Sequence, residues 1–93
     1  MDPLEQRYAD EHRQFLEQNN PSVLSRQSDP SSYLSSVGET AAQMHRDLMF
    51  KHLRNPAVQN LPFPDQATEL QSRLREVEEL VRHDHVLQPV PEE

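Results

Sequence analysis

Apolar residues recur at helical spacing in three segments of this chain, and polar residues lie between them. The clearest rows follow a three-four-three-four spacing, which is the pattern of a helix that buries one side against another helix. In residues 30–54 this row consists of Leu34, Val37, Ala41, Met44 and Leu48. We therefore expect a long amphipathic helix over this range.

The segment from about residue 65 to 87 has the same spacing, with the most regular separation of apolar and polar sides. Its row consists of Ala67, Leu70, Leu74, Val77 and Val81. A narrower apolar row, in which His12 fills a gap, predicts another helix over residues 3–18. The sequence thus predicts an all-α fold with three main amphipathic helices, arranged as a small helical bundle.

Asp-Pro and Asn-Pro pairs mark where helices should begin. The Asx side chain can accept a hydrogen bond from a first-turn N–H, and proline at the first position has no N–H to leave unpaired. The pairs are Asp2-Pro3, Asn20-Pro21, Asp29-Pro30 and Asn55-Pro56. The second and fourth predict short connecting helices near residues 21–27 and 56–61, because Pro62 and Pro64 stop the latter.

Gly38 and Phe63 occupy the two least regular positions of this scheme. Gly38 is the only glycine and falls inside the predicted helix 30–54, where glycine costs about 1 kcal/mol relative to alanine. A close helix crossing or a kink would explain it, and a functional hinge is the alternative. Phe63 stands between two prolines, and we expect it to be extended and to fill a groove of the core. An exposed Pro-Phe-Pro segment would instead suit a docking site.

The apolar content of the chain is low. Hydrophobic residues make up 33% of 93 residues, which is enough for one helical domain, expected over residues 1–87. Such a composition favours either marginal stability or further burial by self-association. Residues 88–93 contain two prolines and two terminal glutamates, and are expected to form a flexible tail.

Charge and cysteine content narrow the classes of function. Nine Lys and Arg against sixteen Asp and Glu give a net charge of −7, which argues against binding along a nucleic acid backbone but permits a basic partner. There is no cysteine, no apolar stretch of about 20 residues, and the first residues are charged. These features predict a cytoplasmic protein without disulfides or a membrane segment.

No residue pattern for catalysis or metal binding is evident. His45 and His52 lie seven residues apart, and Glu79, His83 and His85 gather near a predicted helix end, but neither set has a recognised ligand spacing. No serine lies in a Gly-x-Ser-x-Gly elbow, and a single glycine cannot form a glycine-rich phosphate loop. We expect no cofactor, no metal and no enzymatic activity.

The helix of residues 65–87 is the candidate contact surface. It could pack against the helix of residues 30–54 within one chain, as an antiparallel pair, or it could bind a second copy or another protein. The candidate partner-contact residues are Phe63, Leu70, Arg73, Leu74, Val77, Leu80 and Val81.

Several of these segments resemble the TnpV family of small transposon-encoded proteins. The resemblance rests on Arg13-x-Phe15-Leu16, Asn20-Pro21, Leu24, Tyr33-Leu34, Ala42, Met44, Leu48 and Val77-Glu-Glu-Leu80-Val81. It implies a helical accessory protein of a mobile genetic element, and it supplies no activity or catalytic residue.

Two functions follow as hypotheses. The first is a non-enzymatic protein–protein interaction or accessory protein of a mobile genetic element, acting as a dimer. The alternative is an acidic inhibitor encoded by a phage or plasmid, whose carboxylates mimic nucleic acid in a basic cleft of a host enzyme. A helix-turn-helix regulator is a third option, suggested only by small size and helix content, and no recognition helix rich in Arg, Lys, Asn or Gln is evident.

Overall fold

The computed structural model describes residues 2–87, and every regular element in this range is helical. The all-α prediction is therefore confirmed, while the expected flexible tail at 88–93 lies outside the described residues. The elements are α1 (Pro3–Asn19), α2 (Pro21–Arg26), α3 (Pro30–Leu53), α4 (Pro56–Gln59), α5 (Phe63–Val81) and a closing π-helical segment, η1 (Arg82–Val86).

All four Asx-Pro pairs open helices, as predicted. The Glu5 N–H donates to Asp2 Oδ1 at 2.9 Å, and the Glu5 side chain accepts from the Asp2 N–H, which completes a capping box. The side chains of Asp29 and Asn55 cap α3 and α4 through first-turn N–H groups. Asn20 differs, because its side chain accepts a hydrogen bond from the Ser22 hydroxyl rather than from a first-turn N–H.

The structure corrects the start and the end of the last long helix. α5 begins at Phe63 instead of residue 65, because Pro62 occupies the N-cap and Pro64 lies in the first turn, where a missing N–H breaks no helical bond. Phe63 is helical and 83% exposed, so the expectation of an extended residue filling a core groove was wrong. The regular helix ends at Val81 and continues to Val86 only as η1.

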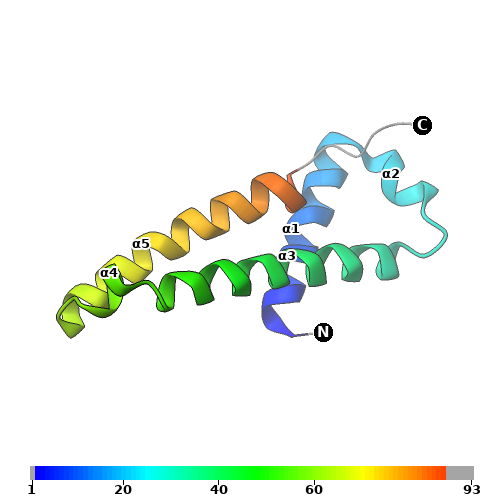
Figure 1. The fold of residues 1–93 in the computed structure, drawn as a ribbon. Coiled ribbons are helices and arrows are strands. Elements are labelled where there is room, and N and C mark those ends of the chain that lie inside the picture. Colours follow the sequence, from blue (N-terminus) through cyan, green and yellow to red (C-terminus); the bar gives the residue numbers. More distant parts are fainter. Residues whose placement is uncertain (1, 88–93) are drawn as a thin grey trace.

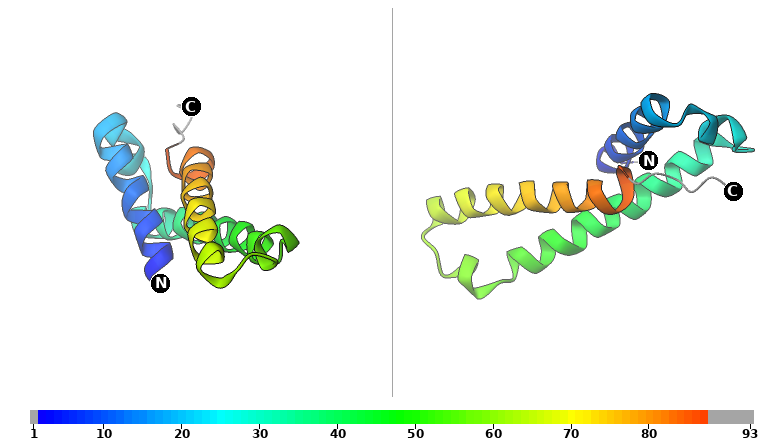
Figure 2. Two further views of the ribbon diagram at one scale, coloured as in Figure 1. Left: turned by 90° about the vertical axis from the view of Figure 1, so that its left-hand side faces the viewer. Right: turned by 90° about the horizontal axis from the view of Figure 1, so that it is seen from above.

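The helices form an elongated molecule of about 51 × 23 × 19 Å. α3 and α5 run antiparallel and are joined by α4 at one end, whereas α1 crosses them at the other (Figures 1 and 2). We call residues 47–76 the arm: the end of α3, α4 and the start of α5. The arm is bounded by Arg46, which pairs with Asp2, the N-cap of α1, and by Val77, the first buried residue of α5. The remaining described residues form the head.

The core lies in the head, where α1, α3, α5 and η1 meet. Its buried cluster consists of Tyr8, Ala41, Ala42, Val77, Val81 and Val86. The two predicted apolar rows thus meet within one chain, with α1 as the third member of the bundle.

Gly38 lies at a close approach of α1 to α3. The helix continues unbroken through this position, so the structure supports the close-crossing interpretation and not a break. A Cβ at Gly38 would overlap the carbonyl oxygen of Glu5 and lie 3.1 Å from the Cβ of Ala9. Glycine lets the two backbones touch here, which offsets its cost to the helix.

Candidate interaction surface

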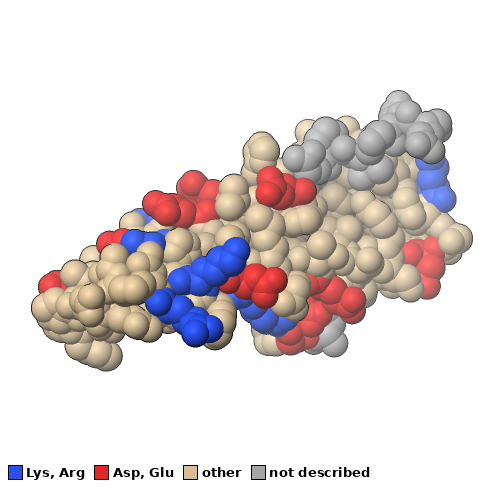
Figure 3. All heavy atoms as spheres, in the orientation of Figure 1, with Lys and Arg blue, Asp and Glu red and all other residues tan. Residues whose placement is uncertain are grey.

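The far end of the arm exposes several large apolar side chains. Phe50 is 57% exposed and Leu53 is 49% exposed in the last turn of α3, and Phe63 is 83% exposed at the start of α5. We call residues 50–64 the tip. Its stretch 55–64 contains no charged residue, although 27% of the chain is charged, and the corresponding left-hand end of Figure 3 is mostly uncharged.

The backbone that presents Phe63 is held by several hydrogen bonds. Val58 of α4 is buried between the two long helices. The Gln66 side chain donates to the carbonyl oxygens of Gln59 and Leu61, at 2.9 Å and 2.8 Å. The Gln59 side chain donates to the Leu53 carbonyl at 3.1 Å. The turn is therefore ordered by its own contacts, and its exposed phenylalanine is presented from a fixed position.

Midway along the arm, polar contacts join the two helices. Arg73 of α5 donates to Nδ1 of His52 at 2.9 Å and to Glu69 at 2.8 Å. Because an arginine only donates, His52 Nδ1 must accept, and the proton of this imidazole lies on Nε2. Arg73, a predicted partner-contact residue, is thus engaged within the chain.

The other predicted contact residues of α5 divide by exposure. Val77 and Val81 are buried in the head core and are not available to a partner. Leu70 and Leu74 are half-buried along the arm. Leu80 and Phe63 are exposed. The apolar row identified a packing face correctly, but its C-terminal part is covered by the chain itself.

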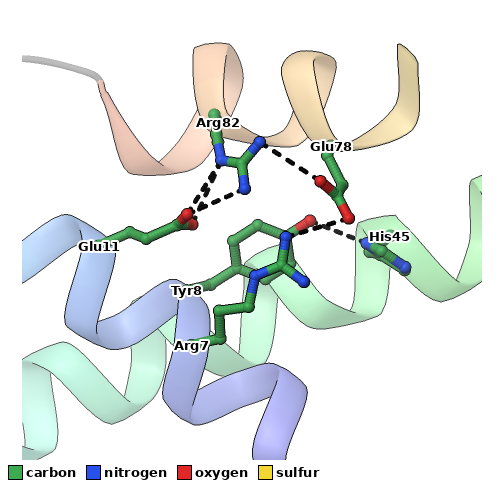
Figure 4. A network of polar contacts seen from close by, with 6 residues as sticks. All are labelled: Arg7, Tyr8, Glu11, His45, Glu78 and Arg82. Carbon is green, nitrogen blue, oxygen red and sulfur yellow. Dashed lines mark hydrogen bonds and ion pairs between the residues drawn. The ribbon is translucent and has the colours of Figure 1, made fainter. Parts of the chain in front are cut away.

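An ion-pair network fixes α5 and η1 to α1 in the head (Figure 4). Arg82 donates two hydrogen bonds to Glu11 through Nη2 and Nε, at 2.9 and 3.1 Å, and contacts Glu78 at 3.4 Å. Arg7 of α1 lies 3.0 Å from the other Glu78 oxygen. Hydrogen bonding to Glu11 is the main reason that the Arg82 pKa is raised. The network joins α5 and η1 to α1.

Below this network, the buried Tyr8 of α1 pairs with the half-buried His45 of α3 (Figure 4). The Tyr8 oxygen lies 2.8 Å from His45 Nδ1, and the Tyr8 side chain has no exposed surface. Burial raises the pKa of Tyr8 to about 12, and the nearby Glu78 carboxylate is the second-largest contribution to this shift. Burial lowers the pKa of His45 despite the opposing effect of Glu78. Both groups are therefore neutral near pH 7.

His12 is the residue whose role the sequence did not reveal. It is 2% exposed, and its ring joins three elements: Nδ1 lies 2.7 Å from the Val86 carbonyl oxygen of η1, and Nε2 lies 2.9 Å from the Tyr33 hydroxyl of α3. A carbonyl oxygen only accepts, so the proton lies on Nδ1. The one available signal was a polar residue within the apolar row of the first helix.

Sites for a metal or a small molecule are weakly developed. Among residues 2–87, no group of three or more His, Asp or Glu side chains is placed to hold a metal ion. An open groove of about 620 Å³ lies between α3 and His85, lined by Met44 and Leu48 together with exposed polar residues. None of the helices within the described range is long and apolar enough to cross a membrane.

Comparisons with models of protein families, with curated proteins and with solved structures gave no match.

Proposed function

We propose that this chain is a non-enzymatic protein–protein interaction module that acts through the tip of its arm. The observation that carries the proposal is the 83% exposure of Phe63 on a turn that is ordered by its own hydrogen bonds. A single exposed apolar residue needs no explanation, but Phe50 and Leu53 are exposed at the same end of the arm.

The chemistry of the tip is that of an interface centre. Such centres are depleted in charge and enriched in aromatic residues, and a few anchors supply most of the binding energy. Within the tip, the stretch 55–64 around Phe63 has no charged residue. Phe63 has the exposure and the fixed backbone of an anchor. The resemblance to TnpV-like proteins adds that the module would serve a mobile genetic element as an accessory protein.

Photocrosslinking at single positions tests this function. A benzophenone amino acid replaces Phe63 in one variant and Gln18, an exposed polar residue of α1, in the other. After irradiation of expressing cells, we expect defined protein adducts from position 63 and none from position 18. Equal labelling from both positions, or no adduct from position 63, would reject the tip as the working surface.

The charge distribution favours a second candidate, an acidic inhibitor of a basic enzyme. Outside the arm, the sequence carries twelve acidic and five basic residues, so the whole net charge of −7 lies there. If these carboxylates hold the partner, about 0.5 M salt should dissociate the complex, whereas the Phe63→Ser variant should still bind the partner. A complex that survives high salt but is lost in the Phe63→Ser variant would favour the tip as the binding surface instead.

A further inference from the structure

We propose that the tip binds a second copy of this chain, so that two arms pack side by side about a two-fold axis into a four-helix bundle. This inference rests on the proposed function, because it names the partner of the same surface.

The first argument is incomplete burial of the arm. Across residues 47–76, all of which are described, Val58 is the one buried side chain, whereas the three-helix head buries a continuous apolar cluster. Two antiparallel helices cannot enclose a core by themselves. A second helical pair packed alongside the first completes a four-helix bundle, an arrangement in which helical pairs commonly bury their apolar sides.

The second argument is electrostatic. Residues 47–76 contain four acidic and four basic side chains, so the arm is neutral in a chain of net charge −7. Two copies that met through their heads would repel each other, because the whole excess of negative charge lies outside the arm. Two copies that meet through their arms bring no net charge of one sign into the contact itself. A neutral arm also offers no net charge to attract a strongly basic or acidic partner.

The third argument is the self-complementary placement of two opposite charges near the far end of the arm. Lys51 lies near the end of α3 and Asp65 lies in the first turn of α5, and neither makes an ion pair within the described residues. A two-fold axis along the arm sets the end of α3 beside the start of α5 of the partner subunit. Lys51 of each copy then faces Asp65 of the partner subunit, and the symmetry forms this pair twice.

The exposed area indicates how strong the association is. Phe50 and Phe63 together expose on the order of 200–350 Å² of aromatic surface. A standard interface covers about 800 Å² per partner, so the half-buried sides of α3 and α5 must contribute the remainder. We therefore expect a dimer that dissociates on dilution, with a Kd in the micromolar range.

Sedimentation equilibrium of the full chain, from about 1 to 300 µM, tests the association. We expect monomer at the low end and dimer at the high end. Phe63→Ser should raise the Kd at least tenfold without changing the helical circular dichroism, because the side chain is already exposed. Leu80→Ser is the matched control, since Leu80 is an exposed apolar residue of α5 outside the arm, and its Kd should be unchanged.

Charge reversal tests the two-fold arrangement. Lys51→Glu and Asp65→Lys should each weaken self-association, because each places like charges opposite one another twice. An equimolar mixture of the two variants should dimerise again, since both cross-pairs are then of opposite sign. A mixture no stronger than either variant alone would overturn the arrangement, as would a dimer that Phe63→Ser leaves intact.

The outcomes separate this inference from the proposed function. A chain that stays monomeric at 300 µM, but crosslinks from position 63 to a different protein, would reject the dimer and support the interaction module. A monomer that gives no adduct from position 63 would reject both.

Discussion

His12 Nδ1 lies 2.7 Å from the Val86 carbonyl oxygen, which ties the middle of the first helix to the end of the described chain. The opposite ring nitrogen meets the Tyr33 hydroxyl at 2.9 Å, so one imidazole holds α1, α3 and η1 together. Both hydrogen bonds are made where His12 itself is almost completely buried. In such a setting, removing one partner leaves the other unsatisfied.

We predict that His12→Leu lowers the free energy of unfolding by about 1–3 kcal/mol, because leucine keeps much of the volume but leaves the Val86 carbonyl without its donor. Tyr33→Phe removes only the contact to Nε2 and should cost about 1 kcal/mol. Urea denaturation followed by circular dichroism measures both values. A His12→Leu protein within 0.5 kcal/mol of the wild type would show that the hydrogen bond to Val86 contributes no stability.

The features that could be predicted from the sequence are those determined over a few residues. Capping by Asp2 and Asp29 depends on side chains three positions from the N–H groups they bind, and both helix starts were correct. The apolar rows of the two long helices likewise follow from local spacing. The start of α5 differs from the prediction because the N-cap and the first turn tolerate the two prolines around Phe63.

What could not be predicted depends on contacts between distant residues. His12 and Val86 are 74 positions apart, and Tyr8 and His45 are 37 apart, so no local pattern relates them. A repeating apolar row identifies the side of a helix that packs, but not whether the neighbour belongs to the same chain. Val77 therefore entered the predicted contact surface although it lies in the core.

The close crossing at Gly38 predicts an unusual response to alanine. In an exposed helix position, Gly→Ala stabilises by up to about 1 kcal/mol. At Gly38 the new Cβ would overlap the Glu5 carbonyl oxygen, which is backbone and can move only with α1. We expect Gly38→Ala to destabilise the protein by about 1–3 kcal/mol in urea denaturation.

Ser36→Ala is the control for this substitution, because Ser36 is exposed on the same helix. It should change the free energy of unfolding by less than about 0.5 kcal/mol. If Gly38→Ala proved as stable as the wild type, α1 and α3 would have to be farther apart than the structure places them.

Acidification should destabilise the protein partly through His45. Its pKa is lowered in the folded state by burial, so below about pH 6.5 the unfolded chain takes up a proton that the folded chain resists. Stability contributed by the neutral imidazole is present above that pH and is lost as the pH falls. The His45→Gln variant is the comparison, because its amide oxygen can still accept a hydrogen bond from the Tyr8 hydroxyl and the glutamine side chain does not titrate.

The measurement is the free energy of unfolding at about pH 7.5 and pH 5.5 for both proteins. The wild type should lose more stability than His45→Gln over this interval, since the other histidines and carboxyl groups are common to both. Equal losses would mean that His45 titrates alike in the folded and unfolded states.

Alkaline conditions should act on the same pair through Tyr8. Its pKa is raised from 10.0 to about 12, so between these values the unfolded chain releases a proton that the folded chain retains. The stability associated with the neutral phenol is present below pH 10 and falls by about 1.4 kcal/mol per pH unit up to pH 12. Tyr8→Phe lacks this proton but also lacks the hydrogen bond to His45, which should cost about 1 kcal/mol at pH 8.

The two stability curves should therefore cross. The wild type is expected to be the more stable protein at pH 8, and Tyr8→Phe the more stable above about pH 11, as measured by urea denaturation at each pH. Tyr33, whose pKa is also raised by burial, is present in both proteins and does not contribute to the difference. Curves that stay parallel from pH 8 to pH 11.5 would show that the Tyr8 hydroxyl ionises as readily in the folded chain as in the unfolded one, which its complete burial against α3 and α5 should prevent.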